Sequence, residues 1–453
     1  MSLPVHICDV KTSYEDHAYR APLKFGGIVT DKVTLLNVVV RVEDAQGRSA
    51  QGFGSMPLGN VWSFPSKVHS YDETLAAMKA LADAIQSITN SCSESGHPVE
   101  LSAMLEPHYL KAAEQVSNQL QLKEPIPKLC ALVVACTFDA AIHDAYGKLH
   151  GVSSYAALGG EFLTSDLSEF LDERFKGESL QQYVSPEPKP RMPLYHLVGA
   201  VDPLEECDIA KRLNDGMPET LPEWIRHDGL THLKIKLNGD NLDWDVERVA
   251  RVDQITEETQ REQGVDDWVY SLDFNERCES VDYLLAFLAK IEERAPRAMQ
   301  RAQYIEQPTA RDLKAHPENK MHKAAAIKPV VIDESLVDYE TLLLAREQGY
   351  TGVALKACKG ISQALLMGAA AQKFDMFLCV QDLTCPGASF LLSAGLAAHV
   401  PPVAAIEGNA RQYVPGANHG WADRYPTVFT VAGGSIDTSS INGPGLGVEP
   451  LSS

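Results

Sequence analysis

Five charged residues stand at the ends of five successive apolar runs in the second half of the chain. They are Lys236, Asp273, Glu306, Asp333 and Lys356, and the steps between them are 37, 33, 27 and 23 residues. Each step has roughly the length of one βα unit, so the pattern predicts one charged residue at the end of each of five consecutive parallel strands. A lysine at the end of a buried strand is unusual, because desolvating its ammonium is costly unless an anion lies nearby.

These residue types suit the removal of a proton from a carboxylate substrate. Asp273, Glu306 and Asp333 would repel one another without a cation, and three hard oxygen ligands suit Mg²⁺, with Mn²⁺ as the alternative. Lys236 precedes this trio by one strand and Lys356 follows it by one strand, so the two lysines would flank a metal-bound substrate. A lysine could then remove the α-proton while the metal stabilises the resulting enediolate. One base permits β-elimination, whereas two bases on opposite faces also permit racemisation or epimerisation.

Eight apolar runs, alternating with amphipathic helical stretches, would position these residues. The runs are MPLYHLVG, THLKIKLNG, WVYSLDFN, AQYIEQP, PVVIDES, GVALKACKG, MFLCVQDL and VAAIEGN. The alternation predicts a parallel (β/α) barrel, in which the C-terminal ends of the strands share one face and carry the active site. An open doubly wound sheet is the alternative, although no glycine-rich phosphate-binding loop follows any of the runs.

The first 130 residues follow a different pattern. A β-rich run at 33–42, a polar turn at 44–48 and the segment GFGSMP predict a short antiparallel meander. Apolar residues at spacings of three and four predict a helix over 71–87. We therefore expect a small α+β domain before the barrel.

Composition restricts the partners of the protein. The formal net charge of −21 argues against nucleic acid or an anionic membrane, but a few local lysines could bind a small anionic substrate. The nine cysteines show no disulfide or zinc spacing, and the N-terminus has no basic segment followed by an apolar one, so a cytoplasmic protein is expected. The expected partner is a small-molecule carboxylate, and the expected assembly is a homo-oligomer.

Six motifs and one helix together resemble the enolase superfamily, in the branch of muconate lactonizing enzymes and dipeptide epimerases. The motifs occur in order as KIK at 234–236, DFN at 273–275, IEQP at 305–308, IDES at 332–335, LKACKG at 355–360 and GPGLGVE at 443–449, and the helix is FDAAIHDAYGK at 138–148. The resemblance implies a modified TIM (β/α) barrel with an N-terminal α+β capping domain. The expected parts are the capping domain at 1–130, a connecting helix and inserted linker at 131–190, the barrel at 191–412 and a segment returning to the capping domain at 413–453.

The resemblance also implies a role for individual residues. It places the metal on Asp273, Glu306 and Asp333, makes Lys236 and Lys356 the bases, and has Lys234 polarise the substrate carboxylate. Residues expected to support these groups are Asn275, Gln307 and Glu334, and those expected to bind the substrate are Gln381, Asp382, Glu407, Asn409, Arg20 and Lys24. Lys359, beside Gly360, is expected to belong to the loop or the helix start and to have no catalytic role.

Two departures from family patterns bear on the branch. The seventh run, CVQDL, contains no histidine, which argues against the branch similar to mandelate racemase. Glu407-Gly408-Asn409 stands where dipeptide epimerases carry an Asp-x-Asp pair that binds an ammonium, so the dipeptide assignment stays open.

The expected function is that of a Mg²⁺-dependent epimerase or racemase acting on a carboxylate. The alternative is a lyase with a single lysine base, either a sugar-acid dehydratase or a cycloisomerase. A Schiff-base barrel enzyme with a nucleophilic Lys356 and a non-catalytic binding protein are less favoured.

Overall fold

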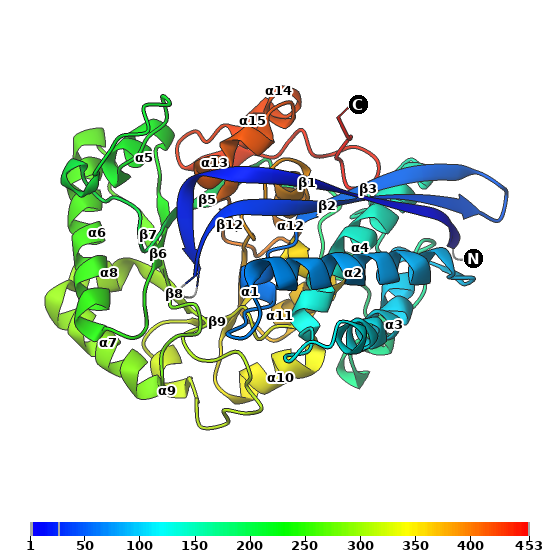
Figure 1. Ribbon diagram of the computed structural model, residues 1–453, viewed down its shortest axis with the longest axis horizontal. Coiled ribbons are helices and arrows are strands. Elements are labelled where there is room, and N and C mark those ends of the chain that lie inside the picture. The colour runs from blue at the N-terminus through cyan, green and yellow to red at the C-terminus, as the bar shows by residue number, and fades with distance from the viewer. Residues whose placement is uncertain (1–2, 26–27, 452–453) are drawn as a thin grey trace.

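An N-terminal antiparallel sheet with its helices lies against an eight-stranded barrel (Figure 1). The computed structural model describes residues 3–25 and 28–451. The sheet has the strand order β3-β2-β1-β4, with antiparallel pairing throughout. Its elements are β1 (Val5–Phe25), β2 (Ile28–Asp44), β3 (Ser49–Pro57), β4 (Ser95–Gly96), α1 (Asn60–Ser63), α2 (Tyr71–Asn90), α3 (Pro98–Gln119) and α4 (Lys128–His150).

Local sequence signals account for much of this part. Helix α2 begins with a capping box, because the Ser70 side chain accepts from the backbone N–H of Glu73 while the Glu73 side chain accepts from that of Ser70. The predicted helix over 71–87 is confirmed and extends to Asn90. The predicted meander corresponds to β2 and β3, but the sheet also contains β1, a strand of 21 residues that the sequence pattern did not indicate.

Helix α4 joins the capping sheet to the barrel. Its contact with β3 requires two glycines, since a Cβ atom at Gly52 or Gly54 would lie 2.1 Å from a carbonyl oxygen of α4. On its other side, the carboxylate of Asp139 accepts from the backbone N–H of Ser362 at 2.9 Å and from its hydroxyl at 2.6 Å. Helix α4 is long and apolar enough to span a membrane, but 94% of its most apolar stretch is buried inside the protein. This burial is typical of a core helix.

The barrel is parallel and closed, as predicted. Its strands follow the order of the chain from β5 to β12, and β12 pairs with β5 to complete the ring. The eight predicted apolar runs form the strands β5 (Arg191–Val198), β6 (His232–Lys236), β7 (Val269–Asp273), β8 (Ala302–Glu306), β9 (Val330–Ile332), β10 (Gly352–Leu355), β11 (Phe377–Val380) and β12 (Ile406–Glu407). Closure excludes the open doubly wound sheet.

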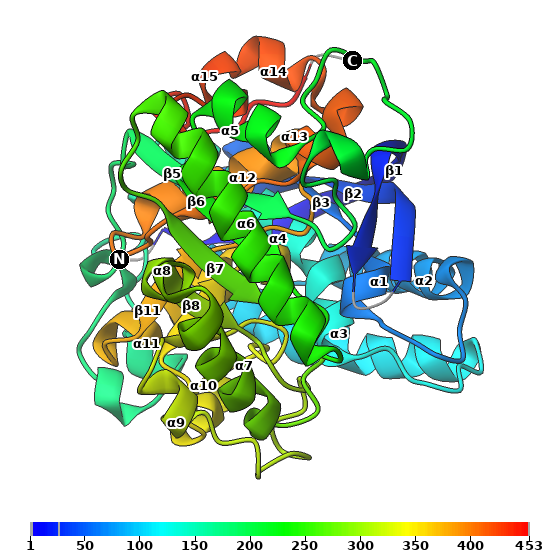
Figure 2. The same ribbon diagram turned by 90° about the vertical axis from the view of Figure 1, so that its left-hand side faces the viewer.

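Helices surround the barrel, and Figure 2 shows α5, α6 and α7 in front of the strands. They are α5 (Leu221–Asp228), α6 (Leu242–Gln263), α7 (Val281–Arg294), α8 (Pro296–Arg301), α9 (His322–Ala325), α10 (Tyr339–Glu347), α11 (Ile361–Lys373) and α12 (Ala388–His399). Inside the barrel, a separate apolar cluster contains Tyr195, Tyr304, Val331, Ala354, Cys379 and Ala405. This layer forms the floor on which the polar residues at the C-terminal strand ends rest.

Two further segments pack on these parts. Residues 161–190 contain the short 3₁₀ turns η1 (Leu167–Glu169), η2 (Glu173–Phe175) and η3 (Leu180–Gln182) and contact α11, where Lys373 pairs with Glu178 at 2.5 Å. The C-terminal segment contains α13 (Ala410–Tyr413), η6 (Pro415–Asn418), α14 (Trp421–Arg424), α15 (Pro426–Phe429) and β13 (Ser435–Asp437). Its end reaches α4, since the backbone N–H of Leu446 donates to Asp144 at 3.0 Å.

The β1–β2 hairpin covers the C-terminal end of the barrel. Leu23 of β1 and Val33 and Leu35 of β2 pack in one cluster with Leu197 of β5 and Tyr413 of α13. Figure 1 shows the two strands extending from the capping helices across to the barrel. The hairpin therefore lies above the strand ends at which the charged residues were predicted.

Candidate active site

The predicted charged residues meet at the C-terminal ends of five adjacent strands. Lys236, Asp273 and Glu306 lie side by side, because Lys236 pairs in register with Asp273 and Asp273 with Glu306. Asp333 directly follows β9, and Lys356 directly follows β10. All five side chains are buried, with residue exposures of 4% or less. The spacing of these residues in the sequence therefore gave a correct prediction of their convergence.

Lys234 lies at the centre of the acidic groups. Its Nζ is 3.1 Å from Asp273 Oδ2, 2.9 Å from Glu306 Oε1 and 3.0 Å from Glu407 Oε2. Lys236 donates to the same Oδ2 atom of Asp273. One buried ammonium thus links carboxylates from three strands, an arrangement that offsets their mutual repulsion.

Lys236 and Lys356 stand on opposite sides of this cluster. In the closed ring of eight strands, three strands separate β6 from β10 in either direction. Lys356 Nζ lies 2.8 Å from Asp333 Oδ2, on the far side from the contact between Lys236 and Asp273. A substrate bound among the carboxylates would therefore have one lysine on each face.

The pKa values of the acids differ according to their neighbours. Burial raises the pKa of Glu306 well above its usual range, and the Asp273 carboxylate adds to this rise, while Lys234 opposes it. Burial also opposes ionisation of Asp273, but Lys236 and Lys234 outweigh it and lower the pKa of Asp273. Lys356 and Lys359 likewise outweigh burial and lower the pKa of Asp333. The lysines thus favour the ionised forms of Asp273 and Asp333, whereas burial and the Asp273 carboxylate favour the neutral form of Glu306.

The cluster as a whole has more acidic than basic groups. Four ammonium groups, those of Lys234, Lys236, Lys356 and Lys359, face six buried carboxyl groups, those of Asp273, Glu306, Asp333, Glu334, Asp382 and Glu407. The carboxyl groups thus outnumber the ammonium groups by two, so a bound cation would favour the ionised forms of more of them. Here the carboxylates contact lysines, and among residues 3–25 and 28–451 no three acidic, histidine or cysteine side chains form a ready-made metal site. By donor type and by charge, the set nevertheless suits a divalent cation bound by oxygen.

Lys359 contacts the charged cluster, which the sequence pattern did not indicate. It does lie in a turn, the 3₁₀ segment η5 (Ala357–Lys359), but its ammonium is buried. Its Nζ donates to the backbone oxygen of Asp333 at 2.5 Å and lies 3.3 Å from Oδ1 of the same residue. Burial lowers the pKa of Lys359. The available signal was its place among small and apolar residues, between Cys358 and Gly360 and shortly before Ile361.

Two of the expected supporting residues, Gln307 and Asn275, make hydrogen bonds that involve backbone N–H groups. Gln307 Oε1 accepts from the backbone N–H groups of Asp333 at 3.0 Å and Ser335 at 3.3 Å, so it holds the turn after β9. The backbone N–H of Asn275, rather than its side chain, donates to Asp273 Oδ1 at 2.8 Å. Both residues have positive φ, 29° for Gln307 and 46° for Asn275, a strained conformation that is common at functional sites.

Four of the expected substrate-binding residues lie in the charged cluster or directly beside it. Gln381 donates to Glu306, and Asn409 Nδ2 donates to Glu407 Oε1 at 2.7 Å. Asp382 accepts from the backbone N–H groups of Thr384 and Cys385, both at 3.2 Å, and of Asn409, at 3.1 Å. Asp382 therefore organises the turn after β11, and its oxygens are already engaged.

The other two expected substrate-binding residues connect the capping hairpin to barrel loops. Arg20 pairs with Asp215 at 2.5 Å, and Lys24 Nζ donates to Asn238 Oδ1 at 3.2 Å. Arg20 also lines a cavity of about 540 Å³ that lies beside the end of β5 and contains Trp224 in its wall. In this arrangement both basic residues have protein partners at the edge of the site.

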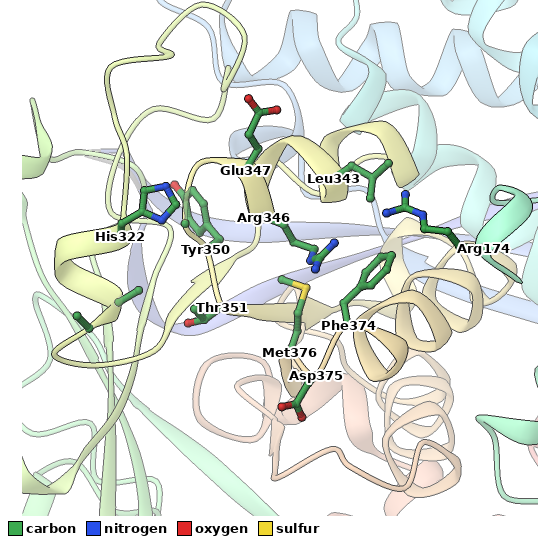
Figure 3. Close-up of a pocket in the computed structure, with 13 residues that line it drawn as sticks. Arg174, His322, Leu343, Arg346, Glu347, Tyr350, Thr351, Phe374, Asp375 and Met376 are labelled. Atoms are coloured by element: carbon green, nitrogen blue, oxygen red, sulfur yellow. The ribbon is translucent and has the colours of Figure 1, made fainter.

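A second cavity, of about 740 Å³, lies at the opposite end of the barrel (Figure 3). Thr351 and Met376 line it, and they directly precede β10 and β11. Arg174 and Arg346 point toward Phe374 from different elements, with distances of 5.0 Å and 3.8 Å to the ring centre. This groove is thus separate from the charged cluster at the C-terminal strand ends.

Comparisons with known proteins agree with this architecture. Residues 216–452, more than half of the chain, match the family described as Enolase C-terminal domain-like. No curated protein matches the sequence. Similar solved structures include the L-Ala-D/L-Glu epimerase of Bacillus subtilis, with 18% identity, a TM-score of 0.64 and 99% of each chain covered.

Two further structures share the fold. The muconate lactonizing enzyme of Pseudomonas fluorescens, complexed with muconolactone, has 16% identity and a TM-score of 0.61, over 98% of this chain and 96% of that chain. The dipeptide epimerase of Cytophaga hutchinsonii, complexed with Mg and the dipeptide D-Ala-L-Val, has 18% identity and a TM-score of 0.59, over 89% of this chain and 87% of that chain. With the family match and the barrel geometry, the chain belongs to the Enolase C-terminal domain-like family and so to the enolase superfamily of enzymes acting on carboxylates.

Proposed function

We propose that the protein is a Mg²⁺-dependent epimerase or racemase that removes and returns the α-proton of a carboxylate substrate. The observation that carries this proposal is the placement of two buried lysines on opposite sides of three buried carboxylates. Lys236 is the last residue of β6 and Lys356 follows β10, and half of the barrel circumference separates them. A base on each face allows the proton to leave from one face and return to the other.

The residues would divide the work as follows. Asp273, Glu306 and Asp333 would hold Mg²⁺, or Mn²⁺ in its place, and the bound ion would supply positive charge that stabilises the deprotonated substrate. Lys234, central among the carboxylates, would hold the substrate carboxylate by charge. Lys236 would exchange a proton with one face of the α-carbon and Lys356 with the other. Gln381 and Asn409 would keep Glu306 and Glu407 oriented through their hydrogen bonds.

A lyase with one base is the second candidate, and a specific observation favours it. Burial opposes the charge on Lys356, but Asp333 more than offsets this and raises the pKa of Lys356. A lysine that keeps its proton is better suited to act as an acid than as a base. In that case Lys236 alone would remove the proton, as in a dehydratase or a cycloisomerase.

A screen for α-proton exchange tests the proposal. Dipeptides, N-acylamino acids and sugar acids would be incubated with the protein and Mg²⁺ in D₂O, and deuterium at the α-carbon would be measured. We expect exchange for one class of acid, and its loss on adding EDTA. Exchange that survives EDTA, together with an adduct trapped by borohydride, would instead indicate Schiff-base chemistry at a lysine. No exchange with any acid would contradict the proposal.

The cellular setting is also part of the proposal. The structure shows all nine cysteines as free thiols, which supports a reducing compartment such as the cytoplasm. A small carboxylate as the partner is consistent with four buried ammonium groups in one site. A homo-oligomer remains a prediction, which light scattering of the purified protein would check.

A further inference from the structure

Trp62 lies in α1 of the capping part and covers the lysine that follows β10. The centre of its indole ring is 4.3 Å from Lys356 Nζ and 5.6 Å from Lys359 Nζ, and the side chain is buried. A cation over an aromatic ring is attracted to it, and more strongly where water is excluded. The capping part thus adds an aromatic residue to a site whose charged groups all come from the barrel.

Two hydrogen bonds fix the orientation of Trp62. Its Nε1 donates to Glu334 Oε1 at 3.0 Å, and its carbonyl oxygen accepts from Arg311 Nη1 at 3.1 Å. Arg311 is itself held by Glu276, with Nε at 3.0 and 2.8 Å from the two carboxylate oxygens. Because these partners follow strands β7, β8 and β9, the indole is attached to the barrel as well as to the cap.

Close packing around α1 also restricts where the indole can lie. Gly59, before α1, has a φ of 53°, and a Cβ atom there would be 2.4 Å from Leu383 Cδ2. Helix α1 therefore packs directly on the turn after β11. The same turn supplies the carbonyl oxygen of Asp382, 3.4 Å from Lys356 Nζ. The amino group is thus enclosed by the indole, this carbonyl and Asp333.

We propose that Trp62 is a positioning residue, which holds the amino group of Lys356 at the point from which it reaches one face of the substrate. The inference rests on the proposed function. Among the three groups around Lys356 Nζ, Asp333 is also needed as a metal ligand and the Asp382 carbonyl oxygen is a long contact of 3.4 Å, so the buried indole is the larger of the two groups left to fix the amine. Position matters because a displacement of about 1 Å can reduce a rate roughly 100-fold.

The variants Trp62→Leu and Trp62→Phe test the proposal, with Trp268→Leu as the matched control. Trp62→Leu removes the ring, whereas Trp62→Phe keeps a smaller aromatic face and loses the hydrogen bond to Glu334. Trp268 has the same kinds of contact at the other end of β7. It is buried, its Nε1 donates to Tyr270 at 2.7 Å, and the Arg301 guanidinium lies 3.7 Å from its ring.

The first measurement is deuterium exchange for each stereoisomer of an exchanging substrate, with Mg²⁺ present. Lys356→Ala identifies the stereoisomer whose proton Lys356 removes. For that isomer, Trp62→Leu is expected to lower kcat about tenfold with little change in KM, and Trp62→Phe to lower it less. Exchange of the other stereoisomer in Trp62→Leu should stay within about twofold of wild type. In Trp268→Leu, exchange of each of the two stereoisomers should stay within the same limit. An equal loss for both isomers in Trp62→Leu, or no loss, would contradict the positioning role.

The second measurement needs no substrate. Reductive methylation followed by peptide mass spectrometry gives the labelling rate of Lys356 relative to Lys236 in the folded protein. Trp62→Leu should raise this ratio about threefold or more, since the ring no longer covers the amine, and Trp268→Leu should leave it unchanged. An unchanged ratio in Trp62→Leu and Trp62→Phe would overturn the inference even if wild type exchanged no substrate. Absence of substrate exchange in wild type would count against the proposed function and not against the position of Trp62 over Lys356.

Discussion

The proposed active site depends on buried lysines that contact buried carboxylates. An unpaired ammonium in the protein interior is costly, and each of these lysines therefore has an acidic partner. Lys234 has three such partners, and Lys356 has Asp333. Removing Asp333 would take away the carboxylate that Lys356 contacts, so this part of the site is sensitive to substitutions that change charge.

Glu334 gives a prediction for the dependence of stability on pH. Burial and the neighbouring Asp333 raise the pKa of Glu334 from 4.5 to about 7. Because the pKa of Glu334 is raised, the folded state favours the neutral carboxyl group. The resulting stabilisation of the folded state is complete below pH 4.5 and is lost as pH rises from there to about 7. Glu334→Gln cannot ionise and still offers an oxygen to Trp62. Between about pH 5 and pH 8, the free energy of unfolding of wild type should therefore fall relative to that of Glu334→Gln by on the order of 2 kcal/mol.

Urea unfolding at several pH values, without added divalent metal, measures this difference. Glu258→Gln, which changes a carboxylate on α6 outside the charged cluster, is the control and should give a profile parallel to that of wild type. Parallel profiles for wild type and Glu334→Gln would show that Glu334 does not carry the proton assigned to it.

At the scale of elements, the barrel strands could be predicted from the sequence and the long capping strand could not. Each barrel strand is an apolar run that ends in polar residues, because a parallel strand is buried on both faces and only its end meets the site. Strand β1 contains acidic and basic residues along its length, and it becomes a strand through its pairing with β2. Its structure depends on a partner that lies elsewhere in the chain.

Contacts between separate parts of the chain also account for the site residues that the sequence did not reveal. Asp273, Glu306 and Asp333 stand at strand ends, where local patterning marks them. Trp62 and Lys359 gain their places from contacts with residues far along the chain, such as Glu334 and Asp333. Neither periodicity nor composition records such contacts.

The close contact between β3 and α4 gives a prediction at this scale. In Gly54→Ala, the new Cβ atom would lie 2.1 Å from Thr137 O and 3.1 Å from Ala141 N, both backbone atoms of α4. The helix must shift to relieve this overlap, and we expect a loss of about 2 kcal/mol or more in the free energy of unfolding. Gly416→Ala is the control, because a Cβ atom there meets nothing within 4 Å. Equal stability of the two variants in urea unfolding would contradict the close packing of α4.

At the scale of the whole molecule, the capping part closes the site that the barrel builds. The β1–β2 hairpin packs on Leu197 and Tyr413 at the C-terminal end of the barrel, and Trp62 covers Lys356 from the same side. The ion pair between Arg20 and Asp215 joins the hairpin to the loop after β5. Arg20 holds the pKa of Asp215 at about 2, so this pair is charged at neutral pH.

Breaking this ion pair should loosen the hairpin. In Arg20→Gln, we expect amide hydrogen exchange of the described residues at the hairpin end, 18–24 and 28–34, to become about fivefold faster, since a partly buried ion pair contributes about 1 kcal/mol to local closure. Lys32→Gln is the control on the same hairpin, because Lys32 and Asp72 are exposed at 54% and 81% and their pairing contributes little. Exchange that is equally fast in both variants, measured by mass spectrometry, would show that Arg20 does not fasten the hairpin.

Lys236 and Lys356 are proposed to serve opposite faces of one α-carbon. The most direct measurement follows α-proton exchange in D₂O, with Mg²⁺, for each stereoisomer of a substrate in Lys236→Ala and Lys356→Ala. We predict that each variant keeps exchange of one stereoisomer and loses the other by at least about 100-fold, and that the two variants keep opposite isomers. Loss of both isomers in Lys236→Ala, with neither lost in Lys356→Ala, would contradict the account and indicate a single base.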